Sequence, residues 1–143
     1  MILDKNLILA ENQAVTATAI SQNIIQLPAS GTVYGEGSPI TRNLGPGEEV
    51  PILIQVVEDF ATLTSLTITL ETADNAALST NAQVLFSTGA IPLAQLVAGY
   101  RTPIRVLPDF PLRDFVGLRF TVTGSNATAG KLTAAIGTEV NAG

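Results

Sequence analysis

The sequence LTITL at residues 66–70 decides the fold class, because it alternates apolar and polar side chains more cleanly than any other segment. A period of two is typical of a β-strand, whose leucines and isoleucine face a core and whose threonines face solvent or a neighbour. Residues 116–123 repeat the pattern, with apolar side chains on one face and Arg119 and Thr121 on the other. Both segments predict strands with one buried face.

Further strand candidates are spread along the chain and are separated by turn residues. Residues 50–57 form a continuous apolar run, which indicates a strand covered on both faces. Pro51 should lie at its start or on a sheet edge. The other expected strands are residues 14–20, 83–87, 104–107 and 131–136. Glycine, proline and asparagine mark the connections, which are an irregular loop at 31–39, a tight turn at 44–48, hairpin or loop segments at 73–76 and 124–127, and a short helical turn at 92–99.

We expect one all-β domain over residues 1–143. This length suits a single domain with one core, and no internal repeat or linker divides the chain. Periodicity alone leaves a barrel and a sandwich open. About eight strands with long connections favour a jelly-roll β-sandwich with long loops.

The composition indicates a surface that a partner covers. Only 13% of the residues are charged, against roughly 25% in an average soluble domain, and interface cores are depleted in charge. An uncharged monomer is the alternative. The net charge of −5 and the lack of a basic run argue against binding to nucleic acid or to an anionic membrane. The N-terminus does not resemble a signal peptide, and no apolar run is long enough to span a membrane.

The residue types present argue against an enzyme and against a bound cofactor. The chain has no His and no Cys, so the usual general base, the thiol nucleophile and the common ligands of zinc, copper and iron are missing. Asp74 and Asn75 are conceivable calcium ligands, but no EF-hand pattern surrounds them. We therefore expect no catalytic residue, no metal and no cofactor.

Several longer motifs resemble a known family. They are residues 91–100 (IPLAQLVAGY), 104–108, 117–124 and 127–134, preceded by 12–19 and 43–50. In order and spacing, over roughly residues 1–136, they resemble the jelly-roll capsid cement (decoration) proteins of tailed bacteriophages. The loop at 28–42 and the segment at 108–114 depart from that pattern.

The resemblance implies a structural virion protein with no catalytic residues. Such a protein binds the outer surface of the capsid, bridges neighbouring copies of the phage major capsid protein and often forms a small homo-oligomer, here expected to be a dimer or trimer. The expected location is the capsid exterior, after assembly in the host cytoplasm.

Candidate contact residues lie in the apolar N-terminus, in the two segments that depart from the family pattern, and at a few aromatic and arginine positions. The apolar N-terminus, within residues 1–12, is either an arm that docks on a neighbour or the first strand of its own sandwich. The candidates are Ile2, Leu3, Leu7, Ile8, Tyr34, Tyr100, Arg101, Phe110 and Arg113.

Two other functions stay open. One is a carbohydrate- or receptor-binding module of a phage particle, in which Tyr34 or Tyr100 stacks on a sugar. The other is a hydrolase that relies on carboxylates alone. Its acids would be two of Glu36, Glu48, Glu58, Asp59 and Glu71.

Overall fold

The computed structural model describes residues 2–26, 34, 35, 37, 49–102, 104–106 and 113–138. Nine strands and one short 3-10 helix are present in this part of the chain. They are β1 (Ile2–Ala14), β2 (Ala19–Ile20), β3 (Ile25–Gln26), β4 (Glu49–Ala61), β5 (Ser65–Ala73), β6 (Gln83–Pro92), η1 (Leu93–Gln95), β7 (Ile104–Val106), β8 (Phe115–Thr123) and β9 (Ala129–Thr138).

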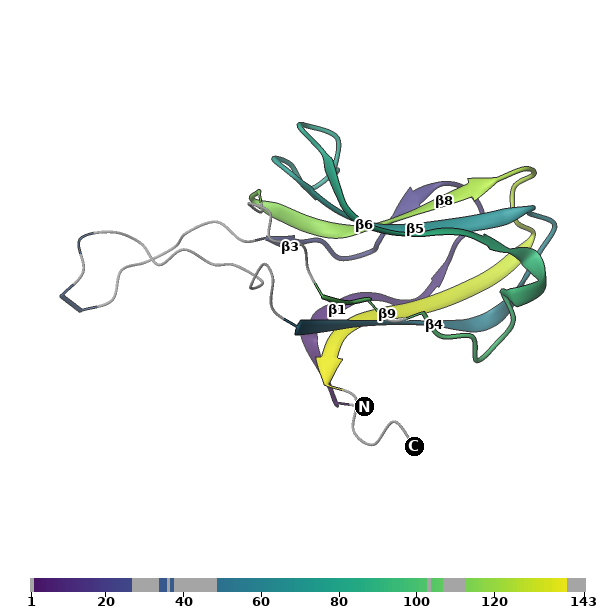
Figure 1. The fold of residues 1–143 in the computed structure, drawn as a ribbon, viewed down its shortest axis with the longest axis horizontal. Coiled ribbons are helices and arrows are strands. Elements are labelled where there is room, and N and C mark those ends of the chain that lie inside the picture. Colours follow the sequence, from purple (N-terminus) through teal and green to yellow (C-terminus); the bar gives the residue numbers. More distant parts are fainter. Residues whose placement is uncertain are drawn as a thin grey trace.

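The strands form two antiparallel sheets that face each other (Figure 1). One sheet has the order β1-β9-β4-β7, and the other has the order β2-β8-β5-β6, with β3 also paired to β8. The pairs are nested along the chain: β1 with β9, β2 and β3 with β8, β4 with β7, and β5 with β6. A long antiparallel ribbon that is rolled up in this way is a jelly roll. The predicted fold class is therefore confirmed.

The core lies between the two sheets and follows the predicted alternation. Leu66, Ile68 and Leu70 of β5 are at most 1% exposed, whereas the threonines between them are half-buried. Phe120 of β8 is fully buried, and its strand neighbour Arg119 is half-buried. Burial of each large apolar side chain contributes about 1.5–3 kcal/mol, so these two central strands supply much of the stability of the sandwich.

The apolar run predicted at residues 50–57 lies in β4, and part of it is buried on both faces. Ile52, Leu53, Ile54 and Val56 are buried, whereas Val57 is 43% exposed. The edge of β4 is covered by the chain after η1, because the N–H of Val56 donates to the carbonyl of Tyr100 at 2.9 Å.

The strand predicted at residues 14–20 is wrong as a single element. β1 ends at Ala14, residues 15–18 are not in a strand, and β2 has only two residues. Val15 is fully buried and donates its N–H to the Gly130 carbonyl at 3.2 Å. The chain crosses here from one sheet to the other, so the connection between sheets overrides the local alternation.

The smaller predictions have mixed outcomes. The helical turn expected at 92–99 is present as η1, with Pro92 at its N-terminus. The tight turn expected at 44–48 lies outside the described residues. Among the residues that the structure describes, no helix is long and apolar enough to cross a membrane.

Candidate interaction surfaces

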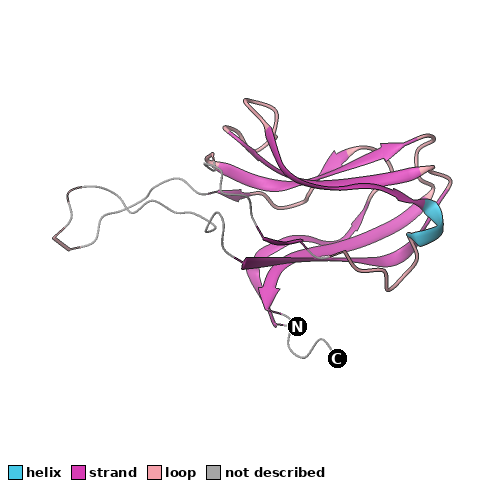
Figure 2. Cartoon of the chain, in the orientation of Figure 1, coloured by secondary structure: helices cyan, strands magenta, loops and turns pink. Residues whose placement is uncertain are grey.

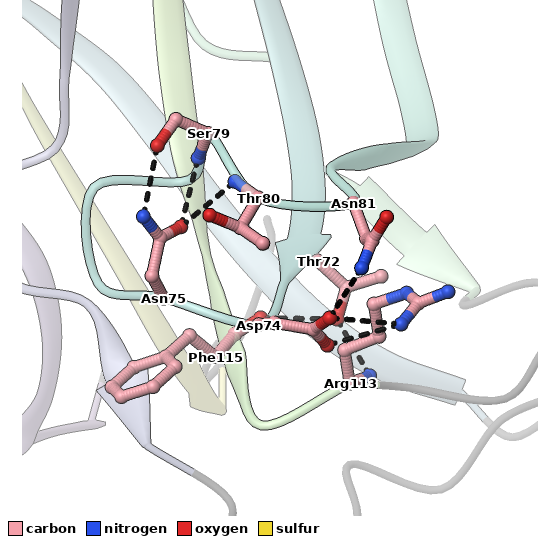
Figure 3. A network of polar contacts seen from close by, with 8 residues as sticks. All are labelled: Thr72, Asp74, Asn75, Ser79, Thr80, Asn81, Arg113 and Phe115. Carbon is pink, nitrogen blue, oxygen red and sulfur yellow. Dashed lines mark hydrogen bonds and ion pairs between the residues drawn. The ribbon is translucent and has the colours of Figure 1, made fainter.

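A polar network holds the β5–β6 loop, residues 74–82 (Figure 3). The side-chain oxygen of Asn75 accepts hydrogen bonds from the N–H groups of Ser79 and Thr80 at 2.9 and 3.0 Å. The N–H of Asp74 donates to the Thr80 carbonyl at 2.9 Å and closes the base of the loop. Because the Asn75 amide replaces backbone partners that a turn lacks, the loop has a defined shape without regular secondary structure.

Arg113 ties this loop to the chain that enters β8. Its Nη1 donates to both carboxylate oxygens of Asp74, at 3.0 and 3.2 Å, and Nδ2 of Asn81 donates to the same carboxylate at 2.7 Å. The N–H of Arg113 donates to the Thr72 hydroxyl at 2.8 Å. The hydrogen bonds from Asn81 and Arg113 lower the pKa of Asp74 below its usual value. The Asp74 charge is therefore balanced by Arg113, which lies outside the loop.

A second arginine, Arg119 of β8, connects β5 to the same loop. Its Nε lies 3.0 Å from Oε2 of Glu71, and its Nη2 donates to the Leu78 carbonyl at 2.7 Å. Glu71 is only 6% exposed, and it also accepts a hydrogen bond of 2.7 Å from the Thr69 hydroxyl. A buried carboxylate needs such partners, because its desolvation is costly. The two arginines thus neutralise two acids on or next to β5.

Leu78 anchors the β5–β6 loop. Its side chain is 1% exposed, although its backbone has a φ of +52°. A Cβ at Gly117 would lie 2.4 Å from Cδ1 of Ile24 and 3.3 Å from Cδ1 of Leu78. The glycine on β8 therefore provides the space in which these two side chains pack.

The edge strand β6 carries exposed apolar side chains. It is the last strand of its sheet, and Val84 and Phe86 are 59% and 37% exposed. Its register against β5 shifts twice, once between the partners of Leu70 and Glu71 and once between those of Thr67 and Thr69. Bulges of this kind bend an edge strand and interrupt the ladder.

One end of the sandwich is formed by four loops without a charged residue. They are residues 15–18, 62–64, 93–99 and 124–128, and Figure 2 shows the short helix η1 at this end. Backbone hydrogen bonds join these loops. The N–H of Ala127 donates to the carbonyl of Thr16 at 2.8 Å, and the N–H of Leu93 donates to the carbonyl of Thr64 at 3.2 Å. We call this surface the uncharged end.

A strained threonine lies in the uncharged end. Thr62 has a φ of +82°, which a β-branched residue rarely adopts. Its hydroxyl lies 2.7 Å from the hydroxyl of Thr128. Strain of this kind persists only where the surrounding structure holds it, and the contact with Thr128 joins this residue to the neighbouring loop.

The carboxylates of Glu58, Asp59, Glu71 and Asp74 have structural partners, and the described carboxylates do not gather into a metal site. Glu58 lies 3.6 Å from Nζ of Lys131, and Asp59 accepts the N–H of Ala98 at 2.7 Å. Within the described ranges, no three His, Cys, Asp or Glu side chains come together. Of the conceivable calcium ligands, Asn75 is engaged within its own loop, and Asp74 is paired with Arg113 from outside the loop. Two acids of the hydrolase hypothesis, at positions 36 and 48, lie outside the described residues.

The N-terminal candidate contacts lie in the first strand of the chain's own sandwich. Ile2 and Leu3 pair with Thr138 and Gly137 of β9. Leu7 and Ile8 follow in the same strand, and Ile8 is half-buried and pairs with Ala135. Of the two alternatives for residues 1–12, the structure therefore supports the first strand of the chain's own sandwich and not an arm.

The other candidate contacts do not form one patch. Tyr34 is fully exposed, whereas Tyr100 packs against the core. Arg101 forms an isolated bridge with Gln55 on β4, and Arg113 is paired with Asp74. Phe110 lies outside the described residues.

Sequence reasoning missed the exposed pair on β6 and the partners of the two arginines. Val84 and Phe86 belong to an apolar stretch that suggests burial, but both are exposed on a strand that has a neighbour on one side only. The one available signal was the lack of any charged residue over Gln83–Pro92.

The topology and these surfaces define the class of the protein, an antiparallel jelly-roll β-sandwich. The family is Bbp16: its family model matches residues 9–136, so the chain belongs to this phage-associated family. The match runs from the middle of β1 into β9 and includes both sheets. No curated protein sequence matches the chain.

Proposed function

We propose that this protein is a cement protein of a tailed-phage particle. In this proposal it binds the outer surface of the capsid as a small homo-oligomer and bridges copies of the major capsid protein. The observation that carries the proposal is membership of a phage-associated family over nearly the whole jelly roll. The motif resemblance at residues 91–100 and 117–124 points the same way.

The surface chemistry supports a protein partner. The uncharged end presents threonine, alanine, glycine and asparagine on loops that are already hydrogen-bonded to each other. Loops that are already joined by hydrogen bonds lose little conformational entropy on binding, and loops without charged residues add no unpaired ion that must be desolvated. The exposed carboxylate of Asp59 lies beside these loops and accepts the N–H of Ala98. We assign the uncharged end as the surface that contacts the capsid.

Stabilisation by such a protein follows from mass action. A ligand that binds the assembled shell, and not its separate subunits, stabilises the assembly by about 2.7 kcal/mol per site at a hundred times its Kd. Many copies act in parallel on one shell, so weak contacts of small side chains suffice.

The test is a binding titration with empty shells of the major capsid protein from the phage that encodes this chain. We expect saturable co-sedimentation with shells, no binding to unassembled capsid subunits, and a higher disruption temperature of the decorated shells. Absence of co-sedimentation at saturating concentration contradicts the proposal. Thr16→Lys and Asn126→Lys, which add charge at exposed positions of the uncharged end, are expected to weaken the binding, and Thr80→Lys in the β5–β6 loop is the matched control.

A saccharide-binding module is the second candidate, and the exposure of Tyr34 favours it. Tyr100 is a poorer stacking residue because it packs against the core. A glycan array followed by calorimetry tests this candidate. A saccharide whose binding disappears in Tyr34→Ala supports it, and a flat array refutes it.

A further inference from the structure

The acids beside β6 are neutralised, although the chain as a whole carries a net charge of −5. Glu71 is the cross-strand partner of Val84, and it is paired with Arg119. Asp74, in the loop that leads into β6, is paired with Arg113. Two copies of this chain repel each other through their net charge, but this side of the sandwich contributes little to that repulsion.

β6 also differs from the other long edge strand in its own sequence. The edge strand β1 contains Asp4, Lys5 and Glu11, whereas Gln83–Pro92 contains no charged residue. Charges on edge strands normally prevent pairing between molecules. In a contact between two identical antiparallel strands, every charged residue would approach its own copy or a near neighbour, so an uncharged strand suits a second copy in particular.

The exposed apolar side chains flank the first irregularity of this edge, because Val84 and Phe86 are the partners of the adjacent residues Glu71 and Leu70. Val84 and Phe86 are two residues apart, and Ser87 follows them. A second interruption of the ladder lies beyond Ser87, and Gly89 has a φ of +72°. An extended intermolecular sheet is therefore disfavoured. A short contact between side chains of two copies, related by a two-fold axis, is still possible.

From these observations we infer that the β6 edge is a two-fold contact between two copies of this chain, centred on Val84 and Phe86. Each copy covers the exposed apolar side chains of the other. The β5–β6 loop, held by Asp74 and Arg113, fixes the start of β6 in place, so little ordering accompanies association. This inference rests on the homo-oligomer of the proposed function and adds which surface forms it.

Cysteine scanning tests this contact directly, because the chain has no cysteine of its own. The full-length variants are Val84→Cys, Ser87→Cys and Ala90→Cys, all at exposed positions, with Val97→Cys of the uncharged end as the control. A disulfide needs Cα atoms within about 7 Å. Three residues away from a two-fold axis, the two equivalent Cα atoms are about 20 Å apart. We expect cross-linked dimer at Val84 or Ser87, and none at Ala90 or Val97.

Mass in solution supplies the second measurement. We expect light scattering to give twice the chain mass of 14.9 kDa, and we expect Val84→Lys to lose the dimer. Val97→Lys, the same change at an exposed valine on the other end, is expected to keep it, and circular dichroism checks that both variants fold. If Val84→Lys does not fold, Ser87→Lys replaces it.

Three results would overturn the inference: a monomer without cross-links, equal cross-linking at all four positions, or a dimer that tolerates both lysines. Binding to shells is measured separately on the same variants. A chain that binds shells but lacks this contact refutes the inference alone, whereas a β6 dimer that ignores shells refutes the cement function alone.

Discussion

Replacing Gly130 with alanine is the sharpest test of how the core is packed. A Cβ at this position would lie 2.3 Å from Cδ1 and 2.5 Å from Cγ of Phe60, far inside van der Waals contact. Phe60 is 6% exposed, and Gly130 has a φ of +138°. Overpacking costs about 1–3 kcal/mol, and the unusual backbone conformation costs another 1–3 kcal/mol, roughly. We expect Gly130→Ala to lower the free energy of unfolding by about 3 kcal/mol and Tm by about 10 °C.

Two other glycines separate these contributions. Gly99 has a φ of +97° with nothing within 4 Å of its Cβ position, so Gly99→Ala carries only the backbone cost. Gly117 has no positive φ, and its nearest contact is the terminal methyl of Ile24, which is free to move more easily than a ring. Urea denaturation with an unchanged m-value measures all three variants. The double variant with Phe60→Leu should recover part of the loss. Two results would contradict this prediction. One is a loss of unfolding free energy in Gly130→Ala that is no larger than in Gly99→Ala. The other is a double variant of Gly130→Ala with Phe60→Leu that is less stable than Gly130→Ala alone.

The remaining predictions concern the β5–β6 loop and its ion pairs. Leu78→Ala should destabilise the protein by about 2–4 kcal/mol, because a fully buried anchor is removed; thermal unfolding checks this, and no change in Tm would contradict it. Arg119→Met leaves Glu71 buried without its cation and should cost about 3 kcal/mol, whereas the double variant with Glu71→Met should recover most of it; denaturant unfolding of both measures the difference. The lowered pKa of Asp74 means that its stabilising contribution is complete above the unfolded pKa of about 4 and is lost as the pH falls through the lower folded pKa. Asp74→Asn should therefore flatten the acid side of the curve of stability against pH, and an unchanged curve would contradict this.

The alternation at 66–70 and 116–123 predicted its strands correctly, because both lie in the centre of a sheet with one face on the core. The segment at 14–20 has a similar alternation, yet it spans the crossing between the two sheets. The alternation of apolar and polar residues cannot distinguish a strand from a segment that crosses between sheets. The position of Val15 is set by its hydrogen bond to Gly130, which is distant in the sequence. The order of the strands is likewise invisible to periodicity, and the jelly roll was favoured by strand number, long connections and the family resemblance.

The candidate surfaces were predicted less well, because they depend on contacts between distant residues. Arg113 appeared as an exposed contact candidate, but it is paired with Asp74, 39 residues away. Tyr100 was a possible stacking residue, but it packs against the core. Conversely, Val84 has an apolar side chain but is exposed on β6, the last strand of its sheet. Residue type alone does not give sheet position, so neither the pairing of the arginines nor the apolar edge followed from the sequence.

The central claim, that this jelly roll cements a phage shell, is tested most directly by cryo-electron microscopy of the phage particle that encodes it. We expect density for one four-stranded and one five-stranded sheet on the outside of the capsid, between neighbouring major capsid subunits, with the uncharged end against the shell. Outer-surface density that lacks this sandwich, or its location on a tail fibre instead, would contradict the account.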